Sequence, residues 1–112
     1  MVLQTANTLA AVNDEVAVGA LADQSTFTCA LNGTLKGTVV VEGTIGGTVW
    51  GPVSFAPYQD PGNANLTMNV TGNEMLIARI PGLTFVRLRV TAYTSGSASA
   101  VARATDGIPS VV

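Results

Sequence analysis

The sequence predicts an all-β protein, namely a single antiparallel β-sandwich of the jelly-roll type with about eight short strands. Apolar and polar residues alternate with a period of two in several segments, which is typical of strands that bury one face. Turn-forming residues recur about every ten residues, as they do in sandwiches and barrels. No segment carries the apolar stripe with a period of about 3.6 residues that marks an amphipathic helix.

The 112 residues form one domain flanked by two extended segments in this prediction. Residues 1–13 are expected to form an extended N-terminal arm, with a short strand at most over residues 2–5. Residues 14–104 are expected to form the sandwich, and residues 105–112 an extended C-terminal tail.

The first half of the sandwich is predicted to hold four strands. Residues 14–21 begin the regular structure, and residues 25–31 alternate cleanly, with Phe27, Cys29 and Leu31 facing inward. Asn32-Gly33 is a strong turn signal, and a strand over residues 37–44 follows it. Residues 48–56 contain Gly51-Pro52, which interrupts ladder hydrogen bonding and therefore indicates an edge strand or a bulge.

The second half is predicted to hold the other four strands. A loop over residues 58–65 precedes strands at 65–70 and 74–80. The last two strands lie within residues 84–104 and are expected to form a hairpin around Thr94-Ser95-Gly96, with Gly96 in the left-handed conformation that glycine tolerates. This hairpin sets Leu88 opposite Ala102, and large residues opposite small ones throughout.

The same hairpin sets Arg87 opposite Arg103 on the outer face, with Arg89 beside them. Like charges across a strand pair are unfavourable, by a fraction of the ~0.2–1 kcal/mol that such pairs contribute. Solvent, Glu42 or Glu74 of an adjacent strand, a carboxylate of a neighbouring subunit or an anionic ligand would offset this repulsion. The candidate partner-interface residues are Arg87, Arg89, Arg103 and Tyr93.

Charge and residue types exclude several function classes. Only 11% of the residues are charged, against about 25% in a typical soluble domain, which favours permanent assembly with other subunits. The net charge of −2 argues against a nucleic-acid partner. A membrane partner is not expected either, because no run of roughly 18 apolar residues occurs.

The sequence offers no catalytic, cofactor or metal constellation, so we expect no enzyme. It contains no histidine, which excludes Ser-His-Asp and Cys-His arrangements. Cys29 is the single cysteine and is expected to be a buried, inert thiol. Trp50 and Phe55 are expected to fill the core, and Tyr58 and Tyr93 to lie at loop ends or interfaces.

Two segments together resemble small β modules in the structural proteins of tailed-bacteriophage virions. The first runs from Val39-Val40-Val41-Glu42-Gly43-Thr44 through a glycine loop to Trp50, and the second covers residues 85–98, FVRLRVTAYTSGSA. Modules of this kind occur in capsid decoration (cement) proteins and in tail fibres. The resemblance implies a jelly-roll-like sandwich without enzymatic activity.

The resemblance favours a capsid decoration protein that stabilises the phage head by bridging major capsid subunits. The expected partners are the major capsid protein and copies of the chain itself, and the expected location is the virion, assembled in the cytoplasm of the bacterial host. The alternative is a carbohydrate- or receptor-binding module of a tail fibre or baseplate, in which Tyr58 would contact a glycan.

Overall fold

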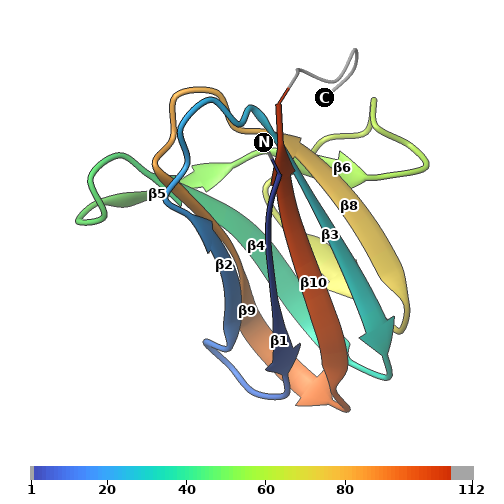
Figure 1. The fold of residues 1–112 in the computed structure, drawn as a ribbon. Helices are drawn as coiled ribbons and strands as arrows, with labels where there is room; N and C mark the ends of the chain where they lie inside the picture. Colours follow the sequence, from blue (N-terminus) through green and yellow to red (C-terminus); the bar gives the residue numbers. More distant parts are fainter. Residues whose placement is uncertain (1, 107–112) are drawn as a thin grey trace.

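Two β-sheets pack face to face in the computed structural model, which describes residues 2–106 (Figure 1). Every strand pairing is antiparallel. The strands are β1 (Leu3–Leu9), β2 (Glu15–Gly19), β3 (Thr26–Gly33), β4 (Lys36–Thr44), β5 (Trp50–Val53), β6 (Phe55–Pro57), β7 (Met68–Val70), β8 (Glu74–Arg79), β9 (Phe85–Ser95) and β10 (Ala98–Thr105).

The strand order is that of a jelly roll. Sheet A has the order β1-β10-β3-β8-β6, and sheet B has the order β2-β9-β4-β5, with β7 also paired to β4. Without β5 and β6, the two sheets read β1-β10-β3-β8 and β2-β9-β4-β7, the paired Greek keys of an eight-stranded jelly roll. Sheet A lies in front of sheet B in Figure 1. The predicted fold class is confirmed.

The last two strands do not form the expected hairpin. β9 lies in sheet B between β2 and β4, whereas β10 lies in sheet A between β1 and β3. Their inward residues meet across the core: Val86, Leu88, Val90, Ala98, Ala100, Ala102 and Ala104. Large side chains therefore face small ones between the sheets, and the alternation that suggested a hairpin serves sheet-on-sheet packing.

The arginine pairing drawn from that hairpin is also wrong. Arg103 lies opposite Gln4 and Thr28 in sheet A, while Arg87 lies in sheet B. The turn residue itself is confirmed, because Gly96 adopts a φ of 79°. A Cβ there would lie 2.2 Å from the carbonyl oxygen of Thr34, so this turn passes tightly against the β3–β4 connection.

The strand containing Gly51-Pro52 lies at a sheet edge, as predicted. β5 pairs with β4 alone, and the chain then leaves sheet B so that β6 can join β8 in sheet A. Phe55 and Cys29 are buried as expected. Trp50 is only partly buried, because β5 directs it to the outer face of sheet B, and its expected place in the core is wrong.

The N-terminal segment belongs to the sandwich over most of its length. β1 pairs with β10 from Leu3 to Leu9, so the expected extended arm is an edge strand of sheet A. The Thr5 Oγ1 donates to the carbonyl of Ala17 and the Asn7 Nδ2 to that of Glu15, both at 2.7 Å. These bonds tie β1 to β2 and close this side of the sandwich. Of the expected tail at residues 105–112, Thr105 is the last residue of β10, and residues 107–112 lie outside the described residues.

Candidate functional site

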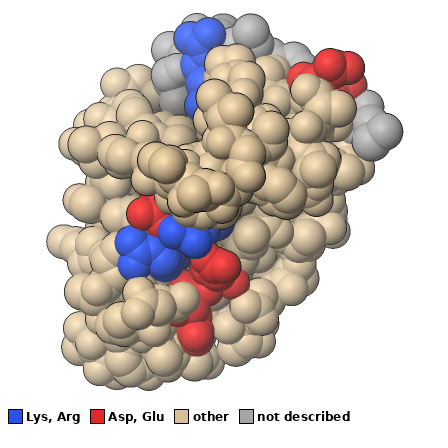
Figure 2. Space-filling view, turned by 90° about the vertical axis from the view of Figure 1, so that its left-hand side faces the viewer, with Lys and Arg blue, Asp and Glu red and all other residues tan. Residues whose placement is uncertain are grey.

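Four charged side chains gather on the outer face of sheet B, and we call them the charged cluster: Glu15, Glu42, Arg87 and Arg89. Figure 2 shows blue and red side chains side by side there, within a face that is otherwise largely uncharged. The strand register explains the gathering. Arg87 and Arg89 point to the same side of β9, opposite Glu42 of β4 and Glu15 of β2 respectively.

Glu42 is the centre of this cluster. Its Oε1 accepts hydrogen bonds from the Nε of Arg87 and the Nε of Arg89, both at 2.9 Å. Its Oε2 accepts a third from the Nη2 of Arg89 at 3.1 Å. The outer contacts are an ion pair between Arg87 Nη1 and Glu15 Oε2 at 3.1 Å and a hydrogen bond from Arg89 Nη1 to Asn13 Oδ1 at 2.9 Å.

The cluster pairs two carboxylates with two guanidinium groups, so its formal charges cancel. The hydrogen bond from Arg89 lowers the pKa of the Glu42 carboxyl, against the opposing effect of partial burial, and the bond from Arg87 adds to the lowering. The same bond with Glu42 raises the pKa of Arg89. Glu42 of the adjacent strand, one of the predicted alternatives, thus offsets the repulsion between the arginines. The cluster therefore has no excess positive charge that would attract an anion.

An exposed apolar loop adjoins the charged cluster. Ile45 and Val49, at the two ends of the β4–β5 loop, are 74% and 77% exposed. Phe85 and Trp50 lie on either side of Thr44 in the sheet register. We call Ile45, Val49, Trp50 and Phe85 the apolar tip. The β4–β5 hairpin projects at the left of the molecule in Figure 1.

Two threonines fix the shape of the apolar tip. The Thr44 Oγ1 donates to the carbonyl of Val49 at 2.6 Å and accepts from the amide of Gly47 at 3.2 Å. The Thr84 Oγ1 accepts from the amide of Gly46 at 3.0 Å. Gly46 and Gly47 both have φ near 86–87°, which side chains rarely adopt. The loop is therefore held in one conformation by internal bonds, although its apolar side chains face solvent.

Trp50 joins the apolar tip to the charged cluster. The guanidinium carbon of Arg87 lies 4.0 Å from the centroid of the Trp50 ring, a cation–π contact. Sequence reasoning missed this role. The sequence signal for this role was Pro52, which indicates an edge strand. In an edge strand, one side of Trp50 has no neighbouring strand to cover it.

The four predicted interface residues do not share one surface. Arg87 and Arg89 lie together in the charged cluster. Tyr93 lies further along β9, where its hydroxyl donates to the carbonyl of Gly96 at 2.8 Å. Arg103 lies on the outer face of sheet A, and its guanidinium forms no hydrogen bond or ion pair with any of residues 2–106.

A shallow groove crosses the outer face of sheet A beside Arg103. It consists of two adjoining depressions of about 440 and 240 Å³, which share Ala30 and Met75. We call it the sheet A groove. Its polar lining residues, apart from Arg103, are Gln4, Thr28, Asn32, Gln59, Asn73 and Glu74.

Metal-ligating groups and the thiol are limited among the described residues. Among residues 2–106, no group of three or more His, Cys, Asp or Glu side chains could hold a metal ion. Burial raises the pKa of the Cys29 thiol to about 12, so this sulfur remains protonated and unreactive at neutral pH. Over the same residues, no helix has the length and hydropathy needed to cross a membrane.

Comparison with solved structures shows the fold. The chain is similar to the SPBc2 prophage-derived protein YomS, with a TM-score of 0.68, 15% identity and coverage of 94% of this chain and 96% of that one. Bacillus endospore appendages (0.43, 16% identity, coverage 96% and 88%) and the Yersinia pseudotuberculosis-derived mitogen (0.42, 14% identity, coverage 96% and 90%) are more distant. No family model and no curated protein sequence matches the chain.

Proposed function

We propose that the protein is a non-enzymatic structural protein of a phage virion, specifically a decoration protein that stabilises the head by bridging major capsid subunits. The jelly-roll sandwich, a fold that recurs in capsid proteins, supports this proposal. The prophage origin of YomS, which shares the fold over nearly the whole chain, supports it further. In this proposal the protein acts in the virion, together with other copies of itself, after assembly in the host cytoplasm.

The apolar tip is the observation that carries the proposal. A soluble protein seldom leaves branched apolar side chains as exposed as Ile45 and Val49 on a loop that internal hydrogen bonds hold rigid. Such a loop loses little conformational entropy when a partner covers it, so burial of its side chains contributes efficiently to binding. We infer that the tip inserts at a junction between major capsid subunits.

The surroundings of the tip suit the rim of such a contact. Interfaces combine an apolar centre with a polar rim in which arginine is frequent, and the charged cluster lies directly beside Trp50. A stable contact buries about 800 Å² on each partner, roughly a seventh of the 5588 Å² accessible surface of this chain. Arg87 and Arg89 belong to this proposed rim, whereas Arg103 lies on the other sheet.

The first edge strand does not serve as the docking element in this proposal. β1 already pairs with β10, and its Thr5 and Asn7 side chains bind carbonyls of β2. A partner's strand that paired with the free edge of β2 would have to displace the bonds from Thr5 and Asn7. In this proposal the protein docks through a preformed surface and not through an extended N-terminal arm.

Heads prepared with and without the protein test the proposal. We expect heads that carry it to resist heat-induced rupture to a higher temperature than heads that lack it, and readdition to restore the difference. The double variant Ile45→Ser/Val49→Ser should not bind or restore stability. Leu66→Ser is the matched control, because Leu66 is also exposed (54%) but lies on the β6–β7 connection.

Equal heat resistance of heads with and without the protein would refute the decoration role. Full binding by the double variant would refute the role of the apolar tip and leave the decoration role standing. The two parts of the proposal are therefore tested separately.

A further inference from the structure

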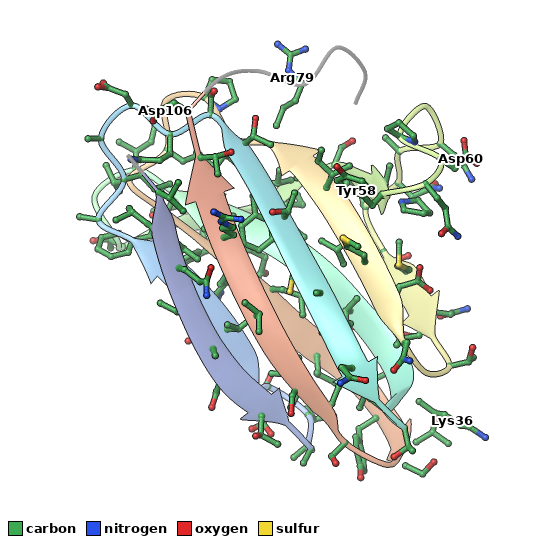
Figure 3. The ribbon with its side chains drawn as sticks, turned by 45° about the vertical axis from the view of Figure 1, so that its right-hand side comes forward. Lys36, Tyr58, Asp60, Arg79 and Asp106 are labelled. Carbon is green, nitrogen blue, oxygen red and sulfur yellow. The ribbon has the colours of Figure 1, made fainter. Side chains whose placement is uncertain are left out.

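We propose that the sheet A groove binds a carboxylate-bearing oligosaccharide, with Arg103 holding the carboxylate. The inference is independent of where the protein sits in a virion, because the groove lies on sheet A and the apolar tip on sheet B. Figure 3 shows the face of sheet A, with Tyr58 and Asp60 on the loop after β6 beside it.

Arg103 supplies the argument for an anionic ligand. Its neighbours in the sheet, Gln4 and Thr28, are uncharged, and none of residues 2–106 forms an ion pair or hydrogen bond with its guanidinium. In contrast, Arg87 and Arg89 are both satisfied by Glu42. Arg103 is the one arginine that lines the groove. A guanidinium presents a planar fork of donors that matches a carboxylate, so this side chain is open to a bidentate ligand.

Most of the remaining lining favours a sugar, and the one carboxylate, Glu74, lines the larger depression and not the one that holds Arg103. Gln4, Asn32, Gln59 and Asn73 contribute amides, which can both donate to and accept from neighbouring hydroxyl groups. The Asn73 Oδ1 accepts from the amide of Gly33 at 2.9 Å, which orients that side chain. Met75, which lines both depressions, and Val101, which lines the smaller one, are 47% and 38% exposed and offer an apolar strip for the nonpolar face of a pyranose ring.

The length of the groove favours an oligosaccharide over a single sugar. Arg103 lies opposite Thr28, and Asn32 is four residues further along β3. At about 3.4 Å per residue these positions are about 14 Å apart, which accommodates more than one ring. A peptide is less suited to this groove for two reasons. The groove runs over the face of the sheet, where the backbone groups are already paired within the sheet, and it has no deep pocket for a side-chain anchor. Nucleic acid is disfavoured by the single cation in the groove.

Titration calorimetry with the purified protein tests this inference. The probes are oligogalacturonate, sialyllactose, a neutral galactose oligomer and a poly-glutamate peptide. We expect binding to a carboxylate sugar, uronate or sialate, and at least about ten-fold weaker binding to the neutral oligomer, the loss expected when a charge-assisted hydrogen bond is absent.

Three exposed substitutions locate the site. Arg103→Gln should weaken binding about ten-fold or more, and Asn32→Ala at the other end should weaken binding of the oligomer by a few-fold. Arg79→Gln is the matched control: Arg79 ends β8 in the same sheet and points away beyond the strand ends in Figure 3, so affinity should stay within about two-fold. Thermal unfolding of each variant verifies that the fold is intact.

Several outcomes would overturn the inference. Absence of binding to both acidic sugars would refute it, as would equal affinity for the neutral oligomer. Equal losses for Arg103→Gln and Arg79→Gln would indicate nonspecific attraction. Tighter binding of poly-glutamate than of the uronate would assign the groove to an acidic peptide instead. None of these results bears on the head-stability experiment, so each of the two proposals can be refuted without affecting the other.

Discussion

Replacing Glu42 by glutamine tests whether the charged cluster is a stabilising unit or a set of independent surface charges. Glu42 accepts three hydrogen bonds from two arginines, and its side chain is only 17% exposed. Glutamine keeps the shape but has one acceptor oxygen, and its amide donors face the guanidinium groups. The bond from Arg89 to Oε2 is lost, both ion pairs with Glu42 disappear, and Glu15 remains as the one carboxylate of the cluster.

The magnitude follows from the burial of the cluster. An exposed ion pair contributes about 0.2–1 kcal/mol, and breaking a fully buried one costs about 3–5 kcal/mol. The cluster is half-buried, so we expect Glu42→Gln to lower the free energy of unfolding by about 2 kcal/mol. At roughly 4 °C per kcal/mol for a chain of this size, the melting temperature should fall by about 8 °C.

The assay is urea and thermal unfolding followed by circular dichroism, with Glu74→Gln as the matched control. Glu74 begins β8 in sheet A and forms no ion pair among the described residues, so its substitution should cost less than about 0.5 kcal/mol. Equal costs for the two variants, or a cost below about 0.5 kcal/mol for Glu42→Gln, would refute the reasoning.

The pH dependence provides a second test of the same claim. The bonds from Arg89 and Arg87 lower the pKa of Glu42 in the folded state below its value of about 4.3 in the unfolded state. Its contribution to stability is therefore complete above that value and is lost as the pH falls through the folded pKa. The difference between wild type and Glu42→Gln should be constant from about pH 6 to 8 and shrink below about pH 4. A difference that grows on acidification would contradict this assignment.

Three further predictions concern the fold. The Cys29 thiol, whose pKa burial raises to about 12, should resist a thiol reagent at pH 8 in the native protein and react promptly in urea; fast native labelling would place this residue outside the core. Gly96→Ala should lower the free energy of unfolding by about 3 kcal/mol because of its φ of 79° and the nearby Thr34 carbonyl, while Gly62→Ala, with open space, should be nearly neutral in the same denaturation experiment. Asn7→Ala should cost about 1 kcal/mol in urea unfolding, since one hydrogen bond to β2 is lost, and a neutral result would show that this bond does not contribute to holding β1.

Most of the strands were predictable from the sequence, but their neighbours were not. The alternation in β9 and β10 identifies which side chains are buried, and both strands occur where expected. It cannot tell a hairpin from two strands facing each other across the core, because Leu88 next to Ala102 satisfies either arrangement. The short Gly96 connection allows the chain either to fold back within a sheet or to cross to the other one.

Because the neighbours of each strand could not be predicted, parts of both candidate sites could not be predicted either. The small and polar residues of β1 suggested an arm. Thr5 and Asn7 are exposed, but they bind β2 carbonyls and so tie β1 to the sandwich. Glu42 was foreseeable as a partner of Arg87 from the strand pattern. The sheet A groove was not, since it joins residues from Gln4 to Arg103 through pairings that only the jelly-roll order reveals.

Electron cryo-microscopy of the virion is the most direct test of the decoration role. We predict copies of a small two-sheet density at the junctions between major capsid subunits of the head, with the loop between β4 and β5 seated in the capsid surface. Density for this chain found in the tail alone, or in no part of the particle, would contradict the account.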